Sequence, residues 1–265
     1  MQLIDIGANL THASFESDLE QVLTEARSAH VAHIMVTGTD IASSEAAQEL
    51  CARYPGYLSC TAGFHPHVAS DCDATAMDTI RRLASAPELV AIGETGLDYN
   101  RNYSPKDAQL AAFEMHLQLA AATGKPLFLH QRDAHEDFIQ LLRQYRSQIT
   151  GGVVHCFTDN AAALSDYLAI DMYIGITGWI CDERRGVELQ EMVADIPADR
   201  LLIETDAPYL LPRTLSPKPK DRRNEPRHLI AVLDMLSQCT KRSSAQLAEE
   251  TTANAQRLFG ISLAI

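Results

Sequence analysis

Four short apolar runs in the sequence each end in a residue that can bind a metal ion. The runs read VAIGE, PLFLH, GGVVH and LLIETD, and the residues that end them are Glu94, His130, His155 and Asp206. Two imidazoles and two carboxylates suit Mg²⁺, Mn²⁺ or Zn²⁺, and this mixed set does not choose between them. Such an ion can lower the pKa of bound water and polarise a phosphoryl or carbonyl oxygen. Asp206 is also a candidate catalytic base for the attacking water.

The spacing of these residues favours one shared site. A (β/α)8 barrel uses roughly 30 residues for each strand and helix, and the three gaps between the residues hold one, one and two such units. The residues would then follow strands four, five, six and eight, whose carboxyl ends meet at one face of a barrel. One such residue alone is more often a hydrogen-bonded structural group, but four together favour a metal site.

The elements that must position these residues follow a regular alternation. Helical patterns, such as residues 14–29 with apolar side chains near a 3.6-residue period, separate apolar runs typical of buried strands. Alternation of this kind predicts right-handed crossovers and a parallel sheet. Eight units predict an α/β fold, a (β/α)8 TIM barrel spanning residues 1–265 as a single domain. An open doubly wound sheet is the alternative, but no GxGxxG or Walker pattern supports it. The expected strands are 2–6, 33–38, 58–63, 89–93, 126–130, 151–155, 172–176 and 200–205.

Composition and charge narrow the class further. The six cysteines show no CxxC pairing, so reduced thiols are expected. The start MQLIDIGANL lacks a signal-peptide pattern and no apolar run could span a bilayer, so we expect a cytoplasmic protein with no membrane partner. A net charge of −13 argues against broad coating of nucleic acid, although a local basic surface remains compatible with it.

Several residues near the expected site could contact a substrate. His65 follows the third strand in the segment GFHPH and could act as a ligand or a phosphate donor, or fix the loop. Arg132 lies close to the end of the fifth strand, where it could reach an anionic group. Asp133 is interpreted as the N-cap of the next helix rather than as a catalyst.

Two basic segments follow the last two strands. Arg184 and Arg185 lie after strand seven together with Trp179, and the long segment 208–226 carries further lysines and arginines. Barrel phosphate sites are often built from these two loops. Charge runs usually mark a solvated face, but here they lie on an acidic protein beside an expected metal site. We therefore expect a phosphate-bearing substrate whose base could stack on Trp179.

Taken together, the sequence resembles the TatD family of metal-dependent deoxyribonucleases. The segments that carry the resemblance are DIGANL, TAGFHPH, AIGETGLDYNRN, FLHQRDAHEDF, VVHCFT, GITGWICDERRG and LLIETDAPYLLPR, in order over nearly the whole chain. The resemblance implies an amidohydrolase-like TIM-barrel hydrolase. It also implies a Mg²⁺-dependent 3′–5′ exonuclease on single-stranded DNA and RNA, with a part in DNA repair. We expect the protein to be a monomer. The histidine of the family's HPH segment corresponds to His65. The family's metal ligands correspond to Glu94, His130, His155 and Asp206.

One segment departs from the family pattern. Many members carry Asp-x-His-x-His on the first strand, but this chain has Gly7 and Asn9 at the two histidine positions. The first metal of the pair, which those histidines bind in other members, would therefore bind loosely or only with substrate phosphate completing its shell. Two other functions stay open: an amidohydrolase-like small-molecule hydrolase, for which no metal-bridging lysine is found at a strand end, and a non-enzymatic scaffold.

Overall fold

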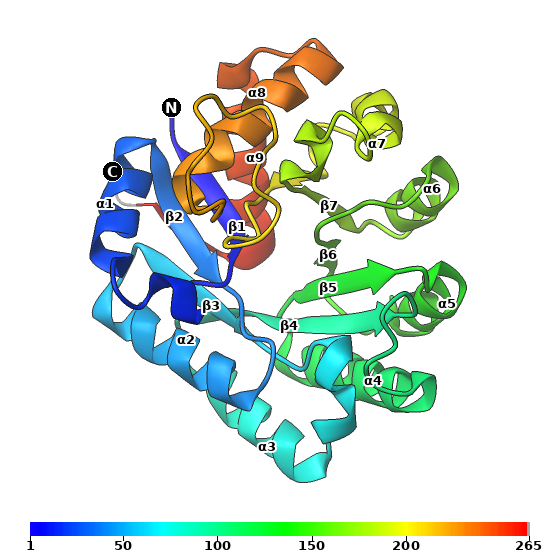
Figure 1. The fold of residues 1–265 in the computed structure, drawn as a ribbon. Coiled ribbons are helices and arrows are strands. Elements are labelled where there is room, and N and C mark those ends of the chain that lie inside the picture. Colours follow the sequence, from blue (N-terminus) through cyan, green and yellow to red (C-terminus); the bar gives the residue numbers. More distant parts are fainter. Residues whose placement is uncertain (264–265) are drawn as a thin grey trace.

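The computed structural model describes residues 1–263, and these form a parallel barrel surrounded by helices (Figure 1). Eight strands pair in the order of the sequence, each parallel to the next. The TIM barrel expected from the sequence is therefore confirmed. The strands are β1 (Leu3–Ala8), β2 (Val31–Val36), β3 (Leu58–Ala62), β4 (Leu89–Asp98), β5 (Leu127–Arg132), β6 (Gly152–Val154), β7 (Tyr173–Ile176) and β8 (Leu201–Ile203).

The helices begin and end where local chemistry favours it. Asp40 and Ser43 form a capping box at the start of α2, and Gly260 ends α9 with a φ of 67°, a conformation that glycine adopts without strain. The helices are α1 (Leu19–Ser28), α2 (Ile41–Arg53), α3 (Ala74–Leu83), α4 (Lys106–Thr123), α5 (His135–Tyr145), α6 (Ala161–Ala169), α7 (Val187–Met192), α8 (Leu229–Thr240) and α9 (Ser244–Phe259). Short 3-10 turns are η1 (Ala13–Phe15), η2 (Pro66–Asp71), η3 (Gly178–Cys181), η4 (Val193–Asp195) and η5 (Pro226–His228).

Two apolar clusters hold the barrel together. The larger one lies between the strands and the surrounding helices. The smaller one combines side chains from alternate strand positions, such as Ile4, Ile6 and Phe128, with Phe259 and Ile261 from the end of the chain. Alternation along a strand sends successive side chains to opposite faces. The second cluster is thus the barrel interior, closed at one end by α9.

The barrel closes between β1 and β8 just beyond the end of β8. The Asp206 amide donates to the Gly7 carbonyl at 2.8 Å, and the Asn9 amide donates to the Ala207 carbonyl at 2.7 Å. The Asp5 carboxylate accepts from the Thr205 amide at 2.9 Å and from its hydroxyl at 2.6 Å. These bonds fix β1 and Asn9 against Asp206, the residue expected to serve as a metal ligand and as the catalytic base.

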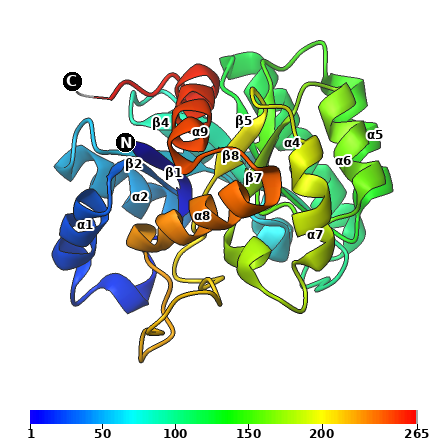
Figure 2. The ribbon, with the colours of Figure 1, turned by 90° about the horizontal axis from the view of Figure 1, so that it is seen from above.

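Strand β4 is longer than the apolar run predicted. It continues through Thr95 and Gly96 to Asp98, which pairs with Arg132 of β5. The expected end at residue 93 was therefore wrong, because hydrogen bonding to β5 sustains the strand after its apolar pattern stops. After β8 the chain runs through a long irregular segment to η5, and Figure 2 shows this segment projecting from the body of the barrel.

Candidate metal centre and its pocket

A pocket of about 730 Å³ opens at the carboxyl ends of the strands. Its walls come from loops after at least six strands, which is how TIM barrels assemble sites from distant parts of the sequence. Among the lining residues are Asn9, His65, His67, Glu94, Asp98, Tyr103, His130, Arg132, His155, Cys156, Trp179, Asp206 and Tyr209.

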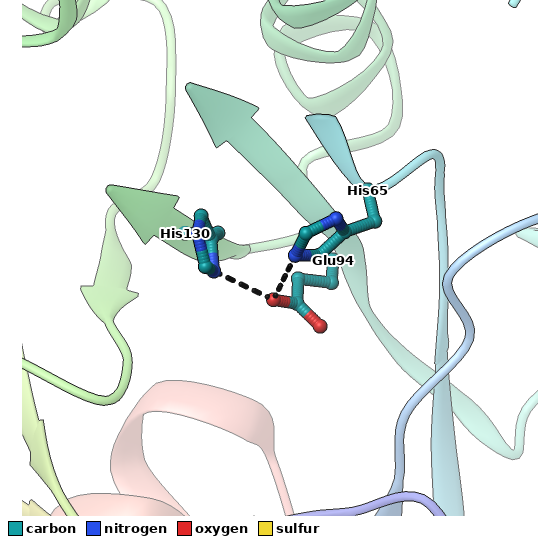
Figure 3. A group of neighbouring side chains, drawn as sticks. All are labelled: His65, Glu94 and His130. Atoms are coloured by element: carbon teal, nitrogen blue, oxygen red, sulfur yellow. Dashed lines mark hydrogen bonds and ion pairs between the residues drawn. The ribbon is translucent and has the colours of Figure 1, made fainter. Parts of the chain in front are cut away.

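Three imidazoles converge on one oxygen of Glu94. Glu94 Oε1 lies 2.8 Å from His155 Nε2, 3.0 Å from His130 Nδ1 and 3.3 Å from His65 Nε2. Figure 3 shows Glu94 with His65 and His130, whose potential ligand atoms all lie within 4.8 Å of one another. Glu94 is 5% exposed, so this convergence is a buried arrangement rather than a surface ion pair.

The backbone before Glu94 depends on a glycine. Gly93 has a φ of 140°, a conformation that side chains rarely allow. A Cβ atom there would also overlap the carbonyl oxygen of Phe128 on β5. Glycine at this position therefore lets β4 lie tightly against β5 where Glu94 and His130 meet.

A second carboxylate, Asp98, contacts His130 and also His67, and the apolar pattern of the sequence does not single it out. Its Oδ2 lies 2.8 Å from His67 Nε2 and 3.4 Å from His130 Nε2. Gln109 of α4 fixes the segment, because its side chain accepts from the Asp98 amide at 2.8 Å and donates to the Asp98 carbonyl. The signal available was the acidic residue after Leu97 in GETGLD, which lies beyond the predicted strand end.

His155 is held from behind by Glu204. His155 Nδ1 lies 3.3 Å from Glu204 Oε2, while Glu204 Oε1 accepts from the Cys156 amide at 2.6 Å. The Glu204 carboxylate lies beside two glycines: a Cβ on Gly7 would lie 2.5 Å from Oε2, and one on Gly175 would lie 2.7 Å from Oε1. The absence of a histidine at position 7 thus has a steric reason, since Glu204 already occupies the space.

Asp206 lines the same pocket in a constrained conformation. It has a φ of 54°, and its Oδ1 accepts from the Asn9 side-chain amide at 3.0 Å. Burial raises the pKa of Asp206 to about 8, and the nearby charges of Glu94 and Glu204 act in the same direction. The second departure from the family pattern, Asn9, therefore holds this aspartate.

The protonation states are those of a cation site. Burial opposes ionisation of Glu94, but the surrounding histidines outweigh it and hold its pKa well below the usual range. Burial likewise opposes charge on His155, but Glu94 and Glu204 raise its pKa well above the usual range. In the site without a metal ion, the positive charge of protonated imidazoles therefore balances the negative charge of the carboxylates. A bound divalent cation would take over this role and displace the protons.

The donors present fit a bound cation. Burial lowers the pKa of His65 to about 4, so this ring is neutral and available as a ligand near neutral pH. His130 Nε2 is buried and makes no hydrogen bond within residues 1–263. This nitrogen lies 3.4 Å from the Asp98 carboxylate, and a buried nitrogen without a hydrogen bond beside a carboxylate is available to bind a cation.

Of the three arginines expected to contact the substrate, one lines the pocket and two lie outside it. Arg132 lines the pocket. The Arg185 guanidinium stacks over Trp179 at 4.2 Å and lies outside this pocket. Arg184 is 64% exposed, with its Nε 3.6 Å from Asp182. The prediction that Asp133 caps a helix was wrong, because α5 begins after Ala134 and Asp133 instead accepts from the Asn100 side chain.

A parallel barrel with histidines and carboxylates at its carboxyl ends is the arrangement of a TIM-barrel enzyme with a candidate metal site. The sequence matches the family described as TatD related DNase over residues 4–260. This chain therefore belongs to the TatD related DNase family. The expected family and hydrolase class are confirmed.

Individual relatives agree over the full length. A protein of Escherichia fergusonii named 3′–5′ ssDNA/RNA exonuclease TatD is 48% identical over 260 residues, covering 98% of this chain and 100% of its own. The protein of the same name from Erwinia billingiae is 48% identical, covering 97% and 98%. The crystal structure of a hydrolase TatD family protein from Entamoeba histolytica is 28% identical, with a TM-score of 0.88 over 99% of each chain.

Proposed function

We propose that this protein is a metal-dependent 3′–5′ exonuclease that hydrolyses phosphodiester bonds of single-stranded DNA and RNA, with Mg²⁺ as its metal. The observation that carries the proposal is the convergence of three imidazoles on Glu94 Oε1 in an open pocket. The substrate and polarity in the names of the relatives support the same reaction. Within residues 1–263, no helix is long and apolar enough to cross a membrane.

The chain's own groups have separable roles. Glu94, His130, His155 and Asp206 would hold the cation, and His65 is close enough to Glu94 to join them. A divalent cation supplies Lewis acidity toward a phosphoryl oxygen and makes water more acidic. A cation bound beside Asp206 would lower the raised pKa of this carboxyl, and the ionised carboxylate would accept the proton of the attacking water. Asn9 holds that carboxylate in place. Arg132 at the pocket wall stabilises the negative charge of the substrate.

Aromatic side chains at the pocket suit an unpaired strand. Tyr103 is 67% exposed and Tyr209 is 51% exposed, and both line the pocket together with Trp179. Large exposed rings are stacking surfaces for bases, and stacking is available only when the bases are not paired. The preference for single strands would arise from these rings.

The test is digestion of a 5′-labelled single-stranded oligonucleotide with Mg²⁺. Attack from the 3′ end gives a ladder of progressively shorter labelled products. We expect Glu94→Ala and Asp206→Ala each to lower the rate by at least about 100-fold, because each removes a residue that would hold the cation or accept the proton of water. Glu191→Ala, a change on the exposed face of α7, is the matched control. Equal rates in all four proteins would remove the proposal.

A further inference from the structure

A second pocket, of about 500 Å³, is strongly basic. We propose that it binds backbone phosphates of the substrate strand on the 5′ side of the scissile bond. This inference rests on the proposed nuclease function and adds a subsite to it. The lining residues are Arg185, Leu210, Leu211, Pro212, Arg213, Lys218, Pro219 and Arg222.

This basic pocket adjoins the pocket that contains Glu94 and its histidines, which we call the metal pocket. Leu210 lines both of them. Trp179 lies in the wall of the metal pocket, and the guanidinium of Arg185, which lines the basic pocket, lies over the Trp179 ring at 4.2 Å. A strand whose base stacks on Trp179 would therefore place its next phosphate beside the basic pocket.

The four cations of this pocket divide into two pairs. Arg185 lies 2.9 Å from Asp182, and Arg213 makes two bonds to Glu183 at 2.6 and 2.8 Å. These two arginines are partly neutralised and fix the shape of the wall. Lys218 and Arg222 have no carboxylate within ion-pair distance in the described part of the chain, residues 1–263. Their charges are the ones available to an incoming phosphate.

The surroundings strengthen this charge. The walls between the cations are apolar, from Leu210, Leu211, Pro212 and Pro219, and no carboxylate of residues 1–263 lines the pocket. Charge interactions are stronger beside such low-dielectric walls than in open water. On a chain with a net charge of −13, the pocket is a localised exception.

The direction of attack decides which side of the strand needs this anchor. A 3′–5′ exonuclease releases the terminal nucleotide, so all remaining phosphates lie on the 5′ side of the cut. The metal pocket is rich in carboxylates, which repel phosphates that are not in contact with the cation. Contacts to the following phosphates would therefore come from a separate basic surface, and affinity should increase with strand length.

The experiment measures binding rather than turnover. Fluorescent oligothymidylates of two, four, eight and twelve nucleotides, with hydrolysis-resistant phosphorothioate linkages, are titrated with Mg²⁺ present. Wild type is compared with Lys218→Gln/Arg222→Gln, which removes two charges but keeps side-chain length. The control is Arg81→Gln/Arg82→Gln on the outer helix α3, where side chains are 60% and 65% exposed.

We expect the affinity of wild type and control to rise with length, and that of the pocket variant to stay near its dinucleotide value. For the longest strand, the dissociation constant of the pocket variant should be about tenfold higher than that of wild type. A plot of log binding constant against log salt concentration should be less steep by roughly 1.4 for this variant. Equal losses in the pocket and control variants, or a loss that includes the dinucleotide, would overturn the subsite. Failure of wild type to cleave unmodified oligonucleotide would instead overturn the proposed function, because the binding comparison does not depend on cleavage.

Discussion

Glu204 fixes which nitrogen of His155 faces the metal pocket. Its Oε2 lies 3.3 Å from His155 Nδ1, which leaves Nε2 directed at Glu94. A carboxylate behind a ligating histidine sets the ring's orientation and its tautomer, with the proton on Nδ1. Gly7 is part of the same arrangement, because any side chain there would displace Glu204.

Glu204→Gln should therefore weaken metal binding although the residue is not expected to touch the metal. The glutamine can keep its oxygen on the Cys156 amide, but its NH₂ group would then face His155 Nδ1 and favour the proton on Nε2. Loss of such a partner lowers metal affinity by about 10- to 100-fold. Titration calorimetry with Mn²⁺ would measure the change.

Gly7→Ala provides a second route to the same effect. Its Cβ would lie 2.5 Å from Glu204 Oε2, so the carboxylate must move. Glu191→Gln on α7 is the matched control for the change from acid to amide. Unchanged Mn²⁺ affinity in both site variants, each folded by circular dichroism, would show that Glu204 does not orient His155.

At the scale of elements, a buried histidine of α4 holds the segment that carries His65. The Phe64 amide donates to His116 Nε2 at 3.0 Å, and His116 Nδ1 donates to the Ala112 carbonyl at 2.7 Å. Both contacts require a neutral ring with its proton on Nδ1. Burial lowers the pKa of His116 to about 4, below its ordinary value of 6.5.

This geometry predicts a loss of stability in mild acid. Between pH 6.5 and about 4 the unfolded chain binds a proton at His116 and the folded chain does not. The free energy of unfolding should therefore fall as the pH drops through this range, by up to about 3 kcal/mol from this residue, and stay level above it. Urea unfolding of wild type and His116→Gln at several pH values would measure the difference.

The difference between the two curves is the informative quantity, because other buried histidines also titrate. His116→Gln should be less stable near neutral pH but lose less on acidification. His30→Asn, at an exposed position with a φ of 67° that asparagine tolerates, is the control. Parallel curves for wild type and His116→Gln would show that His116 is not the group responsible.

The elements also show where prediction from the sequence succeeds. Apolar runs and their spacing were enough for the strands, because buried parallel strands leave a continuous apolar pattern. Asp98 could not be singled out in this way, because β4 reaches it through hydrogen bonds to β5 after the apolar run stops. The sequence identifies Gly7 only as a lost ligand, because the Glu204 carboxylate that fills the space comes from nearly 200 residues away along the chain.

At the scale of the whole molecule, the two ends of the barrel have different tasks. The carboxyl ends of the strands carry the polar pocket, whereas the other end of the barrel interior holds the apolar cluster that α9 closes. Helix α9 packs on both β1 and β8, the strands between which the barrel closes. Separating chemistry from stability in this way is typical of TIM barrels. Changes at the α9 end should therefore alter stability while leaving the metal centre intact.

Phe259→Ala tests this separation. Phe259 is 5% exposed and packs into the interior cluster, so truncation should lower the free energy of unfolding by about 3–5 kcal/mol. For a chain of this size the melting temperature should fall by roughly 10 °C. Phe259→Leu should recover most of the loss, and Val187→Ala, at a 46% exposed position, should change little. Well below the melting temperature, Mn²⁺ affinity should match wild type. A parallel loss of Mn²⁺ affinity would show that the two ends of the barrel are coupled.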